Sequence, residues 1–196
     1  MSAATLTATP TATRQRLIDA ATALFIRHSF AGTSLQMIAD ELGFTKAAIY
    51  HHFRTREQLL SAVLEPIISE LRTVVEDAET LRGVHARAER MLTGYARVAV
   101  DNPALISVLA ADPGVHSVLK ANREWTGMIA RQLALLGDLD PGSEGLLRAR
   151  FVFAGIAGST AQRGSVDRDR LHRHLVEVGR RTLGLRAPRR TRSTTT

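Results

Sequence analysis

The stretch SLQMIADELGFTKAAIYHHF, residues 34–53, decides the fold of the N-terminal region. Its first half repeats apolar residues at the i, i+3, i+4, i+7 spacing that predicts one buried face of a helix. These residues are Leu35, Ile38, Ala39 and Leu42. Gly43 follows at the position where a helix commonly ends in the left-handed backbone conformation, and Phe44 can fold back onto the last turn. The stretch therefore predicts two helices joined by a tight turn.

The second half of this stretch predicts a short helix over residues 46–53 with a narrow apolar side. Thr45 is a favourable N-cap residue for this helix. Only Ile49 and Phe53 need to face the core, so the remaining side chains are free to point outward. The outward side chains are Lys46, Ala47, Tyr50 and His51. They combine hydrogen-bonding groups with a small residue that permits close approach, which is the chemistry of a helix that enters the DNA major groove.

Helices are also predicted on both sides of this helix-turn-helix. Residues 14–28 carry an apolar stripe at helical spacing. Thr55 and Gln58 match the Ser/Thr-x-x-Glu/Gln capping box, which predicts that a fourth helix begins there and continues to about residue 79. Pro66 lies inside this helix, where a missing backbone hydrogen bond and a steric clash predict a kink.

The region 14–60 resembles the N-terminal domain of TetR-type transcriptional regulators. The resemblance is carried by Thr33–Ser34, Ile38–Ala39, Gly43–Phe44–Thr45, Ile49–Tyr50–His51–His52–Phe53 and Arg56–Glu57–Gln58–Leu59. The sequence departs mildly from the family pattern, with Phe44 in place of valine, Ile49 in place of leucine and Arg56 in place of lysine. The other two thirds of the chain match the family only in length and in the helical spacing of their apolar residues.

This resemblance implies a homodimeric repressor that binds double-stranded DNA and has a C-terminal ligand pocket. It implies phosphate contacts from Ser34, Thr45, Tyr50 and Arg56. It implies base contacts from Gln36, Lys46, Ala47, Ala48 and His51, whereas His52 more often braces the domain. A two-fold dimer would set its two recognition helices about 34–36 Å apart, so it would require a near-palindromic operator.

The position of Arg56 gives a further reason to expect a phosphate contact. A cation in the first turn of a helix opposes the helix dipole. Arg56 is therefore better explained if it faces an anion such as a DNA phosphate. The alternative is an exposed arginine that the protein surface tolerates.

The rest of the chain is predicted to consist of further helices. Turn-forming residues separate segments of helical spacing at residues 82–101, 103–111, 114–136, 143–162 and 166–183. The chain is therefore predicted to be all-α, with about nine helices. We expect four parts: a disordered tail (1–13), a helix-turn-helix DNA-binding domain (14–60), a helical ligand-binding and dimerisation domain (61–185) and a basic disordered tail (186–196).

The segment FVFAGIAG, residues 151–158, is apolar around its whole circumference, which predicts a helix buried on every side. Its small residues would let another helix come close. We expect this helix and the helix over 166–183 to pair with their copies in a second subunit. The residues expected at this dimer interface are Phe151, Ala154, Gly155, Gly158, Leu171, Leu175 and Val178. Both helices could instead bury these residues against their own domain.

A mostly apolar pocket is the usual form of a small-molecule site, and we expect one for an effector in the C-terminal domain. Its candidate lining residues are Met91, Tyr95, Trp125 and Met128. Ordinary core packing also explains each of them. Pro66 is the candidate hinge, because an effector that moves the kinked helix would change the spacing of the two recognition helices.

Composition and charge limit the other functions. The chain has no cysteine, which excludes disulfides and thiolate chemistry and fits a cytoplasmic protein. No apolar run is long enough to span a membrane, and residues 1–13 lack the features of a signal peptide. Residues 163–196 hold ten basic and three acidic groups, and thus the whole net charge of +7. This excess favours a polyanionic partner or a solvated helix face.

Enzymatic activity is not predicted, and no cofactor is expected. The sequence has neither a Gly-x-Ser-x-Gly motif nor a Gly-rich phosphate loop. His172 and His174 are two residues apart, so they diverge by about 200° on a helix and do not form a metal-binding pair. Two other functions stay open. One is a DNA-binding architectural protein without an effector, which the C-terminal arginines favour; the other is an activator instead of a repressor.

Overall fold

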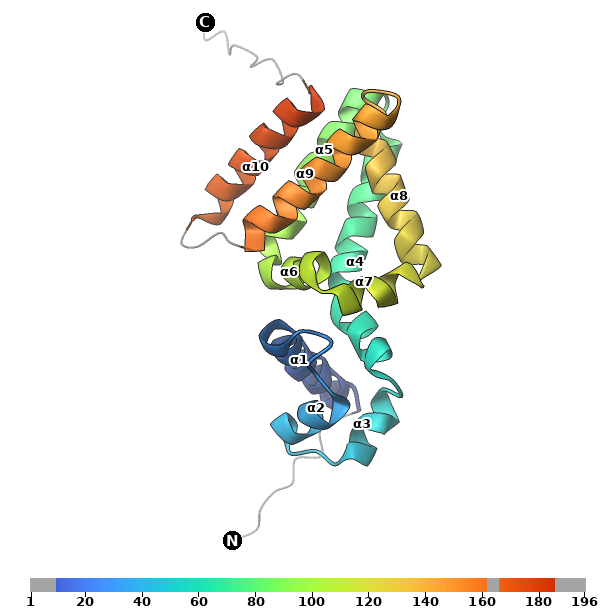
Figure 1. The fold of residues 1–196 in the computed structure, drawn as a ribbon, viewed down its shortest axis with the longest axis vertical. Coiled ribbons are helices and arrows are strands. Elements are labelled where there is room, and N and C mark those ends of the chain that lie inside the picture. Colours follow the sequence, from blue (N-terminus) through green and yellow to red (C-terminus); the bar gives the residue numbers. More distant parts are fainter. Residues whose placement is uncertain (1–9, 162–165, 186–196) are drawn as a thin grey trace, which may run out of the picture. The chain divides into compact units, whose positions relative to one another are not determined.

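The structure, a computed structural model, describes residues 10–161 and 166–185, which form ten helices and no strand (Figure 1). The helices are α1 (Pro10–His28), α2 (Leu35–Leu42), α3 (Lys46–His52), α4 (Arg56–Thr80), α5 (Val84–Asp101), α6 (Pro103–Ala111), α7 (Pro113–Lys120), α8 (Arg123–Gly137), α9 (Ser143–Ala161) and α10 (Arg168–Leu183). The all-α prediction is confirmed, with a helix count close to the predicted nine. The tail predicted over residues 186–196 lies outside the described residues. Within the described chain, no helix has the length and apolarity needed to cross a bilayer.

Two predicted helix boundaries are wrong for local reasons. α1 begins at Pro10, so residues 10–13 belong to a helix and not to a tail. Proline is favoured at the first position of a helix, where its missing N–H would have no partner anyway. The helix predicted over residues 114–136 is in fact two helices, α7 and α8. The Asn122 side chain accepts the Trp125 backbone N–H at 3.1 Å, which is the bond that an N-cap residue makes at the start of a new helix.

The described residues form two compact units. Unit 1 contains the residues up to Ser69 together with Ala104–Trp125, and unit 2 contains Glu70–Pro103 together with the residues from Thr126 onward. α4 and α8 each contribute residues to both units. The domain boundary predicted at residue 60 falls inside unit 1, and α6 and α7 belong to the same unit as the helix-turn-helix.

Unit 1 is organised around a core of aliphatic and aromatic side chains. The buried residues of α1, α2, α3 and the first part of α4 share this core with residues of α6 and α7 such as Val108, Val115 and Leu119. The rings of Phe25 and Phe30 meet edge to face with their centroids 5.4 Å apart. This core fixes α1, α2 and α3 against one another.

In unit 2, α10 packs along both α5 and α9 (Figure 1). Two glycines permit close helix contacts. A Cβ atom at Gly179 of α10 would lie 2.5 Å from Leu92 Cδ1 of α5, and a Cβ atom at Gly94 of α5 would lie 2.4 Å from Val74 Cγ1 of α4. A larger residue at either position would push the neighbouring helix away.

One side of α9 is open in the single chain. Phe151 is 68% exposed. Ala154, Gly155 and Gly158 are also exposed, whereas Val152, Ile156 and Ala157 are buried. The prediction that this segment is buried on every side is therefore wrong for the isolated chain. An apolar circumference shows that water is unfavourable around a helix, but it does not show which chain excludes the water.

Candidate nucleic-acid interface

The turn between α2 and α3 is fixed by backbone and side-chain hydrogen bonds. Gly43 adopts the left-handed conformation with φ +66°, and its N–H donates to the Asp40 carbonyl oxygen at 3.2 Å. The Phe44 N–H donates to the Ala39 carbonyl oxygen at 2.9 Å. Thr45 caps α3, because its Oγ1 accepts the Ala48 N–H at 3.3 Å. The local signals in the sequence therefore position α3 directly after α2.

α3 has one buried side and one exposed side. Ile49 is fully buried, and Phe53, at the C-terminal end of α3, is 3% exposed. The side chains of Lys46, Ala47, Tyr50 and His51 are exposed, and those of Ala48 and His52 are half-buried. Lys46 Nζ lies 5.8 Å from the centroid of the Tyr50 ring. The exposed side thus presents an ammonium, a phenol and an imidazole next to a methyl group, which suits phosphates and base edges.

Two of the predicted DNA contacts at the start of α2 already make hydrogen bonds within the chain. Ser34 Oγ accepts the Met37 N–H at 3.1 Å. A hydroxyl that accepts a bond keeps its own proton for a phosphate oxygen. Gln36 Nε2 donates to Asp40 Oδ1 at 2.7 Å. Both side chains are exposed, so each can also meet an outside partner.

Arg56 binds the segment that connects α1 to α2. Its Nη1 donates to the carbonyl oxygens of Phe30, Ala31 and Thr33 at 3.1, 3.2 and 2.9 Å. Its guanidinium carbon lies 4.2 Å from the centroid of the Phe30 ring. These contacts account for a cation in the first turn of α4, so the helix dipole gives no separate reason to place a phosphate there. The phosphate contact of Arg56 stays a prediction.

Asp112, immediately before α7, binds the same segment. This carboxylate is buried, with 8% exposure. Its Oδ2 accepts the Phe30 N–H at 2.6 Å, and its Oδ1 accepts the N–H groups of Gly114 and Val115 at 2.8 and 3.3 Å. Phe30 is therefore bound through its N–H by Asp112 and through its carbonyl group by Arg56. We call these three residues the Phe30 clamp.

The sequence alone does not reveal this clamp. The Asp112-Pro-Gly segment predicts only a turn, although an aspartate directly before a proline is also the signature of an N-cap followed by the first residue of a helix. That signature gives the Gly114 and Val115 bonds, but nothing in it indicates Phe30.

Comparison with known proteins identifies this arrangement. Residues 17–63, which include α2, the turn, α3 and the start of α4, match the family described as bacterial regulatory proteins, tetR family. The chain carries a TetR-family DNA-binding domain. The resemblance expected from the motifs of residues 33–60 is confirmed.

The curated proteins that match this chain include transcriptional regulators. An HTH-type transcriptional regulator of Saccharopolyspora erythraea is 24% identical over 175 residues, which is 88% of this chain and 67% of the relative. The HTH-type transcriptional repressor AcnR of Corynebacterium glutamicum is 29% identical over 84 residues, which is 41% of this chain and 45% of AcnR. The chain thus spans about two thirds of the first relative and less than half of the second.

The fold of the chain is also that of TetR-type proteins. The TetR family transcriptional regulator PfmR from Thermus thermophilus aligns with a TM-score of 0.65 over 85% of this chain and 97% of that chain, at 21% sequence identity. At this identity the likeness concerns the fold alone. It extends the TetR-type architecture from the N-terminal helix-turn-helix to the C-terminal helices.

Three of the residues predicted to line an effector pocket are buried in unit 2. Met91 is fully buried, Tyr95 is 8% exposed and Met128 is 5% exposed. The Tyr95 hydroxyl donates to the Phe153 carbonyl oxygen at 3.4 Å, and burial raises the pKa of its phenol. Trp125 instead belongs to unit 1, where it packs against the core. The structure therefore does not gather all four residues in one unit.

Gln132 of α8 is a buried polar residue in unit 2 that is not among the predicted site residues. It is 1% exposed, and its Nε2 has no hydrogen-bond partner in residues 10–161 and 166–185. Leaving a buried donor without a partner costs about 1–3 kcal/mol. Gln132 follows Met128 by four residues and so lies on the same side of α8. In the sequence, Gln132 lies at helical spacing from Met128 and Leu135, and this spacing could have predicted that its side chain is buried.

The predicted dimer residues lie on the open sides of α9 and α10. Val178 is 59% exposed, while Leu171 and Leu175 are half-buried. Apart from the adjacent residues and backbone of α9 itself, a Cβ atom added at Gly155 or Gly158 would meet no atom of the described residues within 4 Å. Packing within the chain therefore does not require glycine at position 155 or 158, whereas it does at Gly94 and Gly179.

Proposed function

We propose that this chain is a ligand-responsive transcriptional repressor that binds a near-palindromic operator as a homodimer and is released by a small, mostly apolar effector. The exposed side of α3 carries the proposal. We assign base contacts to Gln36, Lys46, Ala47, Ala48 and His51, and phosphate contacts to Ser34, Thr45, Tyr50 and Arg56. The similarity to the repressor AcnR supports repression as the direction of regulation.

Lys46 provides the decisive test of DNA recognition. Selection of genomic fragments with the purified protein would first supply the operator. Lys46→Ala should then weaken operator binding by about 1–3 kcal/mol and relax the base preference at one operator position. Binding is measured by fluorescence anisotropy at one fixed salt concentration, because phosphate contacts depend on salt.

The chain offers a matched control, because Lys120 is the only other lysine and is exposed at the end of α7. Lys120→Ala removes the same charge and should leave operator affinity unchanged. An equal loss of affinity for operator and random duplex in Lys46→Ala would reassign Lys46 to a phosphate. Unchanged affinity for both duplexes would refute α3 as the recognition helix.

The homodimer is supported by the open apolar sides of α9 and α10. Phe151 and Val178 are more than half exposed, and exposed apolar surface of this kind marks protein interaction sites. Gly155 and Gly158 leave room for a second helix to approach the α9 backbone. A two-fold arrangement would bring the same side of α9 from both copies together.

The effector is supported by the unpartnered amide of Gln132. A small apolar molecule that carries a carbonyl, carboxylate or ether oxygen would accept a hydrogen bond from Gln132 Nε2. Met91, Tyr95 and Met128 are the proposed apolar lining of this site in unit 2, and Trp125 is not retained. A screen for compounds that release the operator tests the effector. If no compound with an acceptor oxygen releases DNA, the protein acts without an effector of this class.

Pro66 is the proposed hinge between effector binding and DNA release. It lies inside α4, where proline leaves one carbonyl group without its helical partner. Pro66→Ala restores that hydrogen bond and should raise the effector concentration needed for release of the operator. Release is followed by anisotropy with increasing effector. An unaltered release curve would show that Pro66 is not the hinge.

The basic excess at the C-terminal end favours a second candidate, a DNA-binding architectural protein without an effector. Ten basic and three acidic groups in residues 163–196 would attract duplexes of any sequence. The fragment selection separates the two candidates, because an architectural protein would recover random fragments. An activator would recover a defined operator, but deletion of its gene would lower expression of the neighbouring genes and not raise it.

A further inference from the structure

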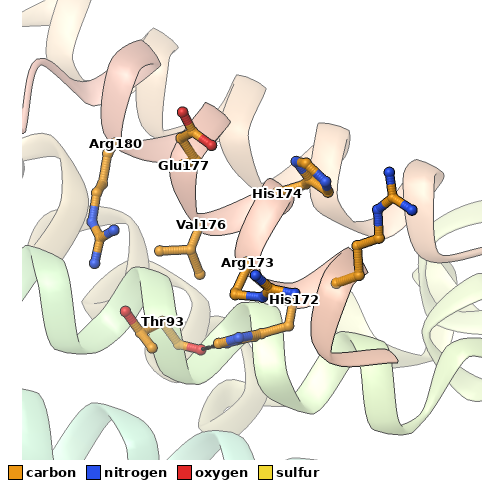
Figure 2. A pocket seen from close by; sticks show the side chains of 8 residues that line it. Thr93, His172, Arg173, His174, Val176, Glu177 and Arg180 are labelled. Atoms are coloured by element: carbon orange, nitrogen blue, oxygen red, sulfur yellow. Dashed lines mark hydrogen bonds between the residues drawn. The ribbon is translucent and has the colours of Figure 1, made fainter. Parts of the chain in front are cut away.

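A groove runs between α5 and α10 in unit 2. It has a volume of about 560 Å³, which lies in the range of small-molecule sites, about 300–1,000 Å³. Figure 2 shows Thr93 on the α5 side and residues of α10 on the other. The lining residues are Thr93, Arg170, His172, Arg173, His174, Val176, Glu177 and Arg180. None of the residues assigned above to DNA, to the dimer or to the effector lines this groove.

The carboxylates near the groove are occupied by arginines. Arg180 Nε donates to both carboxylate oxygens of Glu89 at 2.9 and 3.0 Å, and this bond raises the pKa of Arg180. Glu177 forms an ion pair with Arg181, which does not line the groove. Glu89 and Glu177 are thus each paired with an arginine, and Glu177 also lines the groove.

The first turn of α10 holds the other two acidic groups. Asp169 forms an ion pair with Arg97 of α5 at 3.0 Å. Asp167 caps α10 by accepting the Arg170 backbone N–H at 2.9 Å. The Nε of Arg173 donates to the backbone carbonyl oxygen of Asp169 at 3.3 Å, and not to its carboxylate. Within residues 10–161 and 166–185, Arg170 and Arg173 thus form no ion pair with a carboxylate, so both guanidinium groups are open to an anion from solution.

The imidazole of His172 adds a directed hydrogen-bonding group to the groove. Its Nε2 lies 3.1 Å from the Thr93 carbonyl oxygen (Figure 2). Because a carbonyl oxygen only accepts, Nε2 is the donor in this contact, and the Nδ1 of a neutral ring is then an acceptor for a hydroxyl or amine group of a ligand. The described side chains contain no group of three or more potential metal ligands, so a cation is not the occupant that this chemistry favours.

We propose that the α5–α10 groove binds a small molecule that carries a phosphate group. Arg170 and Arg173 are three residues apart on α10 and therefore lie on the same side of the helix. Two guanidinium groups in this relation present several N–H donors to one anion, and guanidinium geometry matches phosphate oxygens in a bidentate manner. The volume of the groove leaves room for an organic group attached to the phosphate. This site is independent of the proposed effector site at Gln132.

The groove remains accessible if the chain dimerises as proposed. Leu171, at the dimer interface, and Arg180, in the groove, are nine residues apart. At about 100° per residue they lie on opposite sides of α10. Arg173 points about 160° away from Leu171 and Arg170 about 100° away, so a second copy on the apolar side of α10 would leave Arg173 and Arg180 in contact with solvent.

The test uses isothermal titration of the full-length protein with inorganic pyrophosphate at about 0.15 M salt, where long-range electrostatic attraction is screened. Arg170→Gln and Arg173→Gln should each weaken pyrophosphate binding about fivefold or more, since hydrogen bonds to charged groups are the stronger ones. Arg82→Gln removes an exposed arginine that does not line the groove and should change the affinity less than twofold. All three side chains are exposed, so the variants are expected to keep the fold, which circular dichroism checks.

Three results would overturn the proposal. The first is no heat of binding in the wild type, which would mean that the groove does not bind pyrophosphate. The second is an equal loss of affinity in Arg82→Gln, which would mean that the groove is only part of a diffuse positive surface. The third is displacement of pyrophosphate by a random DNA duplex together with loss of duplex binding in Arg173→Gln, which would assign the groove to nucleic acid. None of these results bears on operator recognition by α3, which Lys46→Ala tests separately.

Discussion

Unit 1 and unit 2 differ in how completely their buried polar side chains are hydrogen-bonded. In the described part of unit 1, Thr33 and Asp112 are the buried polar side chains. Thr33 Oγ1 donates to the Ser29 carbonyl oxygen at 2.8 Å, and Asp112 accepts three backbone N–H groups. The corresponding residues of unit 2 are Thr160, which donates to the Ala157 carbonyl oxygen, and Gln132, whose Nε2 has no partner.

The two units also differ in how many large hydrophobic side chains they expose. Of the nine large hydrophobic side chains that are exposed in the described residues, seven lie in unit 2. Unit 1 exposes hydrogen-bonding groups on α3 instead. Unit 1 therefore satisfies its interior alone and presents polar chemistry outward. Unit 2 has most of the exposed large hydrophobic side chains and a buried amide nitrogen that has no hydrogen-bond partner among the described residues.

The largest expected effect is a loss of stability that tests whether unit 1 depends on the hydrogen bonds of Asp112. Asp112→Ala leaves three backbone N–H groups without their carboxylate and should lower the free energy of unfolding by about 2–4 kcal/mol. Urea denaturation followed by circular dichroism measures the change. Asp138→Ala is the control, because Asp138 is exposed and its removal should change stability by less than about 0.5 kcal/mol. Equal stability of the two variants would show that the Phe30 clamp does not hold unit 1 together.

The next effect concerns the assembly of unit 2. Gly155→Leu places a side chain where the chain itself has no atom within 4 Å, so the fold of each subunit should persist. In a dimer the same side chain would separate the two α9 helices and weaken association by about 2 kcal/mol or more, roughly thirtyfold. Analytical ultracentrifugation measures the dissociation constant.

Gly127 of α8 is a matched control for this experiment, since it is also exposed and also has no atom within 4 Å of an added Cβ. Gly127→Leu and Gly155→Leu should both gain up to about 1 kcal/mol of helix stability per residue. Only Gly155→Leu should change the association state. Full retention of the dimer in Gly155→Leu would place the interface elsewhere.

The smallest effect has the opposite sign. Gln132→Leu removes the unpartnered amide and should raise the stability of the ligand-free protein by about 1 kcal/mol, because the buried donor no longer lacks a partner. Gln15→Leu, at an exposed position, should change stability by less than about 0.5 kcal/mol. Thermal unfolding measures both. A lower melting temperature for Gln132→Leu would show that the amide is satisfied in the native protein and that no effector is needed to explain it.

The helix-turn-helix could be predicted from sequence because its determinants are local. Gly43 and Thr45 make their capping hydrogen bonds with residues within four positions, so the spacing of these residues in the sequence predicts the turn. The Phe30 clamp could not be predicted, since Phe30 and Asp112 are 82 residues apart. The exposure of α9 could not be predicted either. A helix buried in its own chain and a helix buried by a partner have the same apolar composition, and only the position of the other helices distinguishes them.

The Phe30 clamp also constrains how this protein can diverge. Asp112 and Arg56 act on the same residue from opposite directions, one on the N–H of Phe30 and the other on its carbonyl oxygen. Loss of either side chain weakens the reason to keep the other, so substitutions at positions 56 and 112 should accumulate together in descendant sequences. Phe30 itself would tolerate few replacements, because its ring packs against the Phe25 ring and the Arg56 guanidinium group.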